Sequence, residues 1–438
     1  MSNTQQKITV FWFRRDLRID DNHGFYKALQ SGHPVLPVFI FDTTILKRLE
    51  NSYDLRVDYI HQAVTELNKR FSEYGSVLHI AYGTPLQVFE ELVNTYTIHE
   101  VITNQDYEPQ AIHRDEEVAL FLKSKNILFS GYKDQVVFEK HEILKSDATP
   151  YTVFTPYSKK WKLLLKEKPV CLYESEKVLS HLYKTEPSDP PSLDKIGFEK
   201  TAIQYTVPAL DKTIIDTYDQ YRDYPSLDHT THLGVALRFG TISIRKCVQF
   251  ALKHNEIWLN ELIWREFFMQ ILFHFPKVVH HCFKEKYERI PWKNDEAEFE
   301  RWCQGKTGYP IVDAGMRELN ETGFMHNRVR MITASFLCKH LLIDWRWGEA
   351  YFAQKLLDYD LSANNGNWQW AAGCGCDAAP YFRIFNPEEQ TKKFDKQLQY
   401  VKKWVPEYGT QRYIEPIIDH RQARERALDV YKKALLNN

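Results

Sequence analysis

The stretch Ile8-Thr-Val-Phe-Trp-Phe13 decides the fold of the first part of the chain, because it is a short, continuous run of β-branched and aromatic residues. Val35–Phe41 has the same texture, and the intervening segment Asp21–Leu29 suits a helix. Strands that are apolar along their whole length are typical of a parallel sheet buried between helices. The opening of the chain therefore predicts a β–α–β unit.

The same alternation of strand and helix continues to about residue 132. Further candidate helices are Asp54–Tyr74, Pro85–Tyr96 and Arg114–Lys125, and further candidate strands are Val77–Ala81, Val101–Thr103 and Ile127–Phe129. Repeated units of this size predict an α/β domain over residues 1–132, with a parallel, Rossmann-like sheet covered by helices on both faces. No Gly-x-Gly-x-x-Gly follows the first strand, so the fold alone places no nucleotide in this domain.

The second half of the chain has a helical pattern. Residues 133–207 are expected to connect the halves, since Pro187, Pro190 and Pro191 are typical of a loop. Helical periodicity then recurs over Arg245–His254, Ile257–Phe273, Ala297–Cys303, Ala314–Glu321, Arg328–Leu341, Glu349–Leu357 and Ala423–Leu435. We therefore expect an all-α domain over residues 208–438.

Bulk composition narrows the function classes. The 57 basic and 58 acidic residues nearly cancel, so any nucleic-acid site must be a local patch. The 14% aromatic content can fill cores or stack on ring-shaped ligands. Seven mostly widely spaced cysteines and a polar N-terminus favour a reducing, cytoplasmic location. Cys374-Gly-Cys376 lacks further ligands, so no metal site is predicted.

Three polar clusters stand out in the helical half, Trp258–Phe267, Gly323–Met331 and Leu357–Trp370. Each has an ordinary structural explanation as a surface ion pair, solvated arginines or a loop with buried aromatics. The amides and glycine of the third cluster predict irregular backbone. Together the clusters would bring many polar groups and indoles into one domain, as an aromatic-lined cofactor or base pocket requires.

The segment Phe11-Trp-Phe-Arg-Arg-Asp-Leu-Arg18, followed by Asp21-Asn22, resembles the opening of the photolyase/cryptochrome family. Other motifs that resemble this family, over a region from about Ile8 to Pro406, are Trp258–Phe267, Gly305–Ala314, His326–Met331, Asn364–Trp370 and Asp377–Pro387. His326-Asn-Arg and Trp370 resemble the class I branch that repairs cyclobutane pyrimidine dimers, whereas the (6-4) branch typically has paired histidines at His326-Asn327.

The resemblance implies that the helical domain binds FAD in a folded form. The residues that it assigns to FAD are Tyr218, Thr230, Thr231, His232, Leu233, Gly234, Trp258, Arg265, Arg330, Asp358, Tyr359, Asp360 and Asn364. Hydroxyls and backbone N–H groups at a helix start suit the pyrophosphate, but Gly234 stands where members often have serine. Asn364 is expected to face flavin N5. A neutral amide there is a poor proton donor, which favours repair over plant-type signalling.

The resemblance also implies a light-driven lyase that splits cyclobutane pyrimidine dimers by electron transfer from excited, reduced FAD to a flipped-out dimer. Glu261 would hydrogen-bond the dimer and steady its radical anion, and Trp264 and Trp370 would sandwich it. Further contacts with the lesion or its DNA are expected from Asn327, Met331, Arg328, Arg383, Gln390, Lys392 and Lys393. Trp368, Trp345 and Trp292 match the tryptophan chain that photoreduces oxidised FAD.

The expected partner is ultraviolet-damaged DNA with little sequence preference, and the expected state is a monomer with no membrane contact. A second, antenna chromophore stays open between folate, a deazaflavin, another flavin and none. Tyr107-Glu108 resembles part of a folate pattern from which Val279 and His280 depart. The alternative function is a cryptochrome-like blue-light receptor, although no long tail of the kind used by many receptors follows the helical domain. A dark flavin oxidoreductase has no supporting motif.

Overall fold

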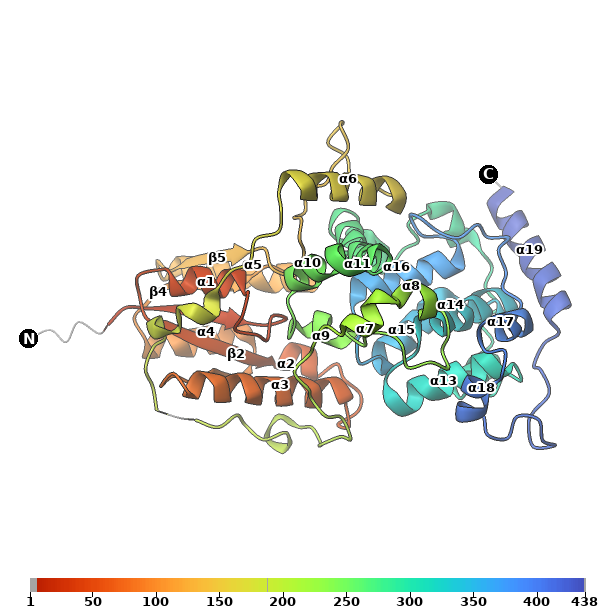
Figure 1. Cartoon of the computed structure of the whole chain (residues 1–438), viewed down its shortest axis with the longest axis horizontal. Helices are drawn as coiled ribbons and strands as arrows, with labels where there is room; N and C mark the ends of the chain where they lie inside the picture. The colour runs from red at the N-terminus through yellow and green to blue at the C-terminus, as the bar shows by residue number, and fades with distance from the viewer. Residues whose placement is uncertain (1–5, 187, 437–438) are drawn as a thin grey trace, which may run out of the picture. The chain divides into compact units, whose positions relative to one another are not determined.

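The computed structural model describes residues 6–186 and 188–436, which form two compact units. The first unit comprises the chain up to residue 142 with residues 161–210 and 232–254, and the second comprises residues 143–160, 211–231 and 255 onward. The strands lie in the first unit, and the second is helical (Figure 1). The expected fold class is confirmed. Pro187 lies outside the described residues.

Five parallel strands form the sheet of the first unit, in the order β3-β2-β1-β4-β5. They span Ile8–Phe13 (β1), Val35–Asp42 (β2), His79–Gly83 (β3), Ile98–Asn104 (β4) and Leu128–Tyr132 (β5). Every residue of β1 and β2 is buried, as their continuous apolar pattern predicts. The sheet is therefore parallel and Rossmann-like, as the repeated β–α units predict.

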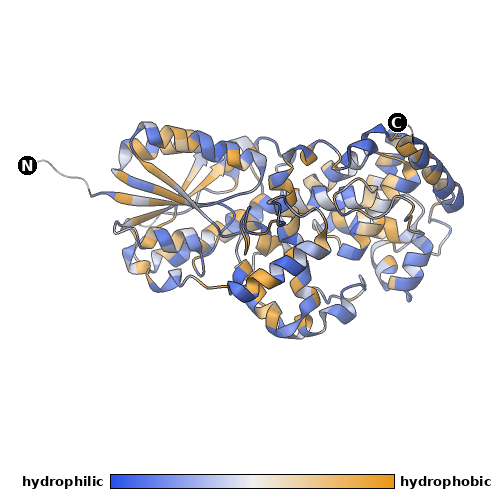
Figure 2. Cartoon of the chain, turned by 90° about the horizontal axis from the view of Figure 1, so that it is seen from above, coloured by the Kyte–Doolittle hydropathy of each residue, from blue (hydrophilic) through white to orange (hydrophobic). Residues whose placement is uncertain are grey.

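Capping side chains start the helices of the first unit. Asn22 caps α1 (His23–Leu29), Asp54 caps α3 (Leu55–Ser72), and Thr84 forms a capping box at α4 (Pro85–Thr95). The other helices of this unit are α2 (Thr43–Leu46), α5 (Pro109–Ser124), α9 (Gly234–Phe239) and α10 (Ile244–His254), with 3-10 turns at Ser175–Lys177, Leu179–His181 and Asp194–Ile196. Hydrophilic and hydrophobic residues alternate along the helical ribbons, a pattern typical of amphipathic helices (Figure 2).

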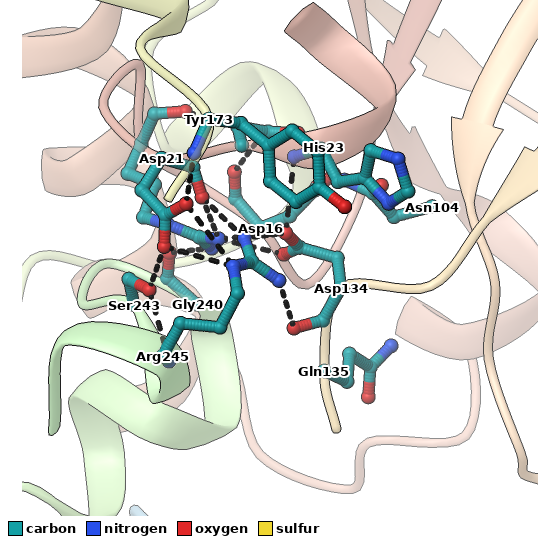
Figure 3. Close-up of polar contacts among 12 residues, drawn as sticks. Asp16, Asp21, His23, Asn104, Asp134, Gln135, Tyr173, Gly240, Ser243 and Arg245 are labelled. Carbon is teal, nitrogen blue, oxygen red and sulfur yellow. Dashed lines mark hydrogen bonds and ion pairs between the residues drawn. The ribbon is translucent and has the colours of Figure 1, made fainter. Parts of the chain in front are cut away.

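A buried charge network connects α10 to the loops after β1 and β5 (Figure 3). Arg245 on α10 donates Nε to both oxygens of Asp21 at 3.0 Å and Nη2 to Asp134 Oδ1 at 2.7 Å. Arg18 donates to both oxygens of Asp134 at 2.8 Å. This network explains why residues 232–254 belong to the first unit, whereas the sequence-based boundaries of 1–132, 133–207 and 208–438 place them in the helical domain.

The segment expected to be a connector contains one long helix, α6 (Phe154–Glu167). Its first part, up to residue 160, belongs to the second unit, and its remainder belongs to the first. Tyr157, Trp161, Leu164 and Leu165 are buried at helical spacing. The amphipathic pattern of α6 is visible in the sequence. The interpretation of residues 133–207 as a connector depended instead on the prolines near residue 190.

The second unit contains a large hydrophobic core built from residues 282–434, which includes Trp302, Trp345 and Trp368. Its helices besides the start of α6 are α7 (Lys212–Asp216), α8 (Tyr218–Tyr221), α11 (Glu256–His274), α12 (Glu296–Cys303), α13 (Pro310–Thr322), α14 (Asn327–Ser335), α15 (Trp345–Lys355), α16 (Leu361–Ala372), α17 (Pro387–Phe394), α18 (Gln399–Trp404) and α19 (His420–Leu436), with 3-10 turns at Pro276–Val279 and Glu285–Arg289. A π-helical turn, η6 (Phe336–Leu341), follows α14. Among the described residues, no helix is long and apolar enough to cross a membrane.

Candidate active site

Helix α16 carries three of the residues singled out from the sequence, Asn364, Trp368 and Trp370. Asp360 caps it by accepting hydrogen bonds from the backbone N–H groups of Ser362 and Ala363, at 3.1 and 3.2 Å. The expectation of irregular backbone between residues 361 and 370 is therefore wrong. Gly366 lies within this helix and faces Phe268 of α11. A larger residue would not fit there, because a Cβ at that position would lie 2.2 Å from the ring of Phe268. The glycine thus serves close packing between α11 and α16 rather than a turn.

A cavity of about 580 Å³, including its open mouth, lies between α14, α15 and α16 and the loop before α16. Its wall combines apolar side chains with amides and charged groups. The lining residues expected from the sequence are Asn327, Arg330, Met331, Asp358, Tyr359, Asp360, Asn364, Trp368 and Trp370. Residues assigned separately to FAD, to the lesion and to electron transfer thus line one cavity.

Arg330 and Asp358 form the ion pair expected beside the flavin ring. Arg330 Nη2 lies 3.0 Å from Asp358 Oδ2, and Arg330 Nε donates to the carbonyl of Met325 at 2.7 Å. The other carboxylate oxygen, Asp358 Oδ1, is buried and has no hydrogen-bond partner among the described residues. A buried acceptor without a donor is costly, so this oxygen fits a polar ligand in the cavity.

Asn364 is hydrogen-bonded to Glu349 on the neighbouring helix α15. Its Nδ2 donates to the backbone carbonyl of Glu349 at 3.0 Å and to the Glu349 carboxylate at 2.9 Å. Burial raises the pKa of Glu349, although the hydrogen bond from Asn364 opposes that shift. No sequence pattern singles out Glu349, because an acid in an amphipathic helix is usually solvated.

The three tryptophans expected to carry electrons differ in their exposure. Trp368 and Trp345 are buried, and neither indole N–H has a hydrogen-bond partner among the described residues. Trp292 is partly buried and packs edge-on against Tyr431. Trp368 fits closely against α15, because a Cβ at Gly348 would lie 2.1 Å from its ring. The set therefore contains a residue of the cavity wall, a residue of the core and a partly buried residue.

Helix α11 carries Glu261 and Trp264, which do not line the cavity between α14 and α16. Glu261 forms an ion pair with Arg222, at 2.5 Å. Trp264 stacks face to face on Phe154 of α6, with ring centroids 3.7 Å apart and planes 5° apart. Trp258, expected to contact FAD, is buried in the same helix, whose first turn is capped by Asn255. Arg222 and Phe154 are partners that the sequence did not reveal.

Helix α14 presents Asn327 and Met331 to the cavity, whereas Arg328 is already paired. The imidazole of His326 caps this helix by accepting from the backbone N–H of Arg328. The Arg328 guanidinium lies 2.7 Å from Asp223 and 4.4 Å from the ring centroid of Phe394. Any phosphate bound by Arg328 would therefore compete with a carboxylate.

The other residues expected to bind FAD are distributed between both units. Tyr218 begins α8, where Arg222 lies over its ring at 5.1 Å, and Arg265 is half-buried on α11. Thr230 and Thr231 belong to the second unit. His232, Leu233 and Gly234 belong to the first unit, in which Gly234 begins α9 and His232 has a φ of 50°.

The other residues expected to contact DNA lie on the loop after α16 and on α17. The Arg383 guanidinium lies 5.8 Å from the ring centroid of Trp370 and 5.4 Å from that of Phe385. Gln390, Lys392 and Lys393 are on α17, and Lys392 is paired with Glu389 at 2.7 Å. Arg383 is thus adjacent to a residue of the cavity wall.

Tyr107 and Glu108, the candidates for an antenna pocket, are engaged within the first unit. The Tyr107 hydroxyl donates to Glu139 at 2.9 Å. The Glu108 carboxylate lies 2.8 Å from Arg15 and 2.6 Å from Arg238. A chromophore that used Glu108 would therefore share it with two guanidinium groups.

Comparison with known proteins assigns the chain to a family. The family model described as DNA photolyase matches residues 9–173, and that described as the FAD binding domain of DNA photolyase matches residues 258–411. A deoxyribodipyrimidine photo-lyase of Synechococcus is 37% identical over 98% of this chain and 97% of its own length. The expectation of a photo-lyase enzyme is confirmed by this relative and by others of the same name.

Solved structures of photolyases support the same family assignment. A bacterial class III photolyase from Agrobacterium tumefaciens superposes with a TM-score of 0.86 and 31% identity, over 99% of this chain and 98% of that one. An archaeal photolyase from Sulfolobus tokodaii, solved with two FAD molecules, gives a TM-score of 0.79 and 33% identity, over 97% and 99%. The chain therefore belongs to the photolyase/cryptochrome family, and its helical half contains the FAD-binding domain of DNA photolyase.

Proposed function

We propose that this chain repairs cyclobutane pyrimidine dimers in ultraviolet-damaged DNA by light-driven electron transfer. The observation that carries the proposal is the single cavity in which Asn327, Met331 and Trp370 share a wall with Arg330 and Asn364. One set of side chains suits a flipped-out base pair, and the other suits a flavin. The assignment to class I, rather than another class of the family, is part of this proposal.

The residues of the cavity fit FAD chemically. Arg330 and Asp358 provide a fixed ion pair, and the unpartnered Asp358 Oδ1 offers an acceptor. Asp360 and Asn364 add polar groups to the same wall. Bound there, reduced FAD would supply light absorption and the electron for repair. The side chains of the chain hold and orient the flavin, and Glu349 fixes the direction in which the Asn364 amide points.

The lesion would be held by stacking and by hydrogen bonds. Trp370, Asn327 and Met331 line the cavity, while Glu261 and Trp264 would reach the dimer from α11. Glu261 is paired with Arg222, whose guanidinium would orient the carboxylate toward the dimer. Flipping a damaged pair costs less than flipping an intact pair, so selectivity needs no sequence readout.

Two further roles belong to the proposal. Trp368, Trp345 and Trp292 would carry electrons to oxidised FAD, since Trp368 lines the cavity and Trp292 is partly exposed. Arg383, Gln390 and Lys393 would contact DNA phosphates, with Arg328 and Lys392 contributing once released from Asp223 and Glu389. Binding should therefore weaken as salt increases.

The test is repair in light and in darkness. Chemically reduced, FAD-loaded protein is mixed with thymine-dimer DNA under near-ultraviolet or blue light, and restored thymines are assayed. We expect repair in light only. No repair by properly reduced protein would overturn the proposal and favour a light-receptor function. Glu261→Ala should lower the repair yield while FAD stays bound; an unchanged yield would remove Glu261 from the mechanism.

A further inference from the structure

The start of helix α6 packs directly on the proposed lesion-binding helix α11, within the second unit. The ring of Phe154 covers Trp264 at 3.7 Å, and it meets Phe267 edge-on at 5.9 Å. The Phe154 backbone N–H donates to Asp377 Oδ2 at 2.9 Å. Phe154 is thus fixed both by its ring and by its backbone, so it leaves the indole of Trp264 little freedom to turn.

The next turn of α6 is anchored to α11 on either side of Trp264. The Tyr157 hydroxyl donates to Glu266 at 3.3 Å, and the Ser158 hydroxyl lies 3.5 Å from Asn260 Oδ1. Asn260 immediately precedes Glu261, the acid proposed to bind the dimer. Residues 154–160, which we name the α6 shoulder, therefore form one packed surface with the proposed lesion contacts of α11.

The α6 shoulder also carries positive charge. Lys159 is exposed and Lys160 is half-exposed. No described carboxylate pairs with either ammonium group, in contrast to Arg328 and Lys392, whose charges are partly neutralised. Residues 154–160 contain no acidic side chain. Two cations without a carboxylate partner, on the helix that packs against Trp264, would be complementary to the phosphates that flank a lesion stacked on that indole.

We propose that the α6 shoulder is a second DNA-binding surface, in which Lys159 and Lys160 contact backbone phosphates and Phe154 is the positioning residue of Trp264. The inference rests on the proposed function, since Trp264 must meet DNA. The lysines and Phe154 should affect binding to damaged and undamaged DNA differently. Phosphate contacts strengthen binding to damaged and undamaged DNA alike, whereas an ordered indole strengthens binding to the dimer alone.

The test compares equilibrium binding of FAD-loaded full-length variants to one duplex with and without a thymine dimer, by fluorescence anisotropy over a salt series. Lys159→Ser with Lys160→Ser should weaken both complexes by the same factor and reduce the slope of log K against log salt by up to about 0.9 per lost contact. Lys432→Ser, an exposed lysine on α19, is the matched control and should change neither value.

Phe154→Leu should lower the preference for the dimer by about three- to tenfold, the scale of one aromatic stack. Phe154→Tyr keeps the ring and should retain the preference, which separates stacking from a general folding defect. Lysine variants that match Lys432→Ser, or a dimer preference unchanged in Phe154→Leu, would overturn the inference. A wild-type protein without any dimer preference would instead overturn the proposed function itself.

Discussion

The side-chain amide of Asn364 and the carboxylate of Glu349 bridge helices α16 and α15 within the wall of the cavity, with Nδ2 2.9 Å from Oε1. Asn364 can keep its Oδ1 for a ligand because its donor is used internally. The orientation of the amide is thereby set by a residue on another helix. This arrangement has consequences for pH that can be tested without light.

Glu349→Gln should stabilise the protein at alkaline pH. Burial raises the pKa of Glu349 in the folded state, so this group favours folding below its unfolded pKa and loses that contribution as pH rises through the folded pKa. Glutamine copies the protonated acid and still accepts from Asn364. The melting temperature of the variant should exceed that of wild type by about 1–3 °C at pH 8, with the difference shrinking toward pH 5. A lower melting temperature at pH 8 would contradict this assignment.

Trp368→Phe should abolish photoreduction of oxidised FAD but leave repair by chemically reduced protein intact. The reason is that Trp368 is the only member of its proposed chain among the residues lining the described cavity. Trp302→Phe is the matched control, because Trp302 also contacts Trp368, with centroids 6.1 Å apart. Bleaching of the flavin absorbance under light measures the effect. Equal bleaching in both variants would exclude Trp368 from the path.

Asp358→Asn should weaken FAD retention by about tenfold or more, since Arg330 would lose its charged partner beside the cavity. Asp223→Asn removes the partner of Arg328, outside the described cavity lining, and should leave FAD bound. The ratio of flavin to protein absorbance after gel filtration measures retention. Equal flavin content in both variants would show that the pair of Arg330 and Asp358 does not hold the cofactor.

Arg222→Met should reduce the repair yield more than it reduces stability. The ion pair with Glu261 is partly exposed, with side-chain exposures of 19% and 34%, so its loss should change the free energy of unfolding by less than about 1 kcal/mol. Without the guanidinium, the Glu261 carboxylate is free to take other rotamers and meets the dimer less often. Repair yield and chemical denaturation, measured on the same preparations, would separate the two effects. A yield equal to wild type would show that Arg222 does not orient Glu261.

Much of the fold could be predicted because its signals are local. The apolar runs of β1 and β2 and the amphipathic repeats of the long helices need no distant partner to be recognised. Helix α16 could not be predicted, because Gly366 and its neighbouring amides indicate a turn unless Phe268 is known to pack against the glycine. The glycine position is decided by a residue almost a hundred places earlier in the sequence.

The site was predictable where motif residues face one cavity, as Asn327, Arg330 and Asp358 do. Their partners were not, because Glu349, Arg222 and Phe154 become relevant only through contacts between helices. From the sequence alone, Glu349 is interpreted as a solvated acid, Arg222 as a solvated arginine and Phe154 as a core aromatic residue. Tertiary packing supplies the information that spacing along the chain lacks.

The salt-bridged cluster around Arg245 restricts how the gene can be cut for expression. A fragment ending at residue 142 would keep the whole sheet but would strip Asp21 of its guanidinium partner and leave Asp134 only one of its two. Those buried carboxylates would then lack the Arg245 guanidinium that compensates their charge. We therefore expect a stand-alone sheet fragment to be recovered only when the stretch 232–254 is grafted back onto it.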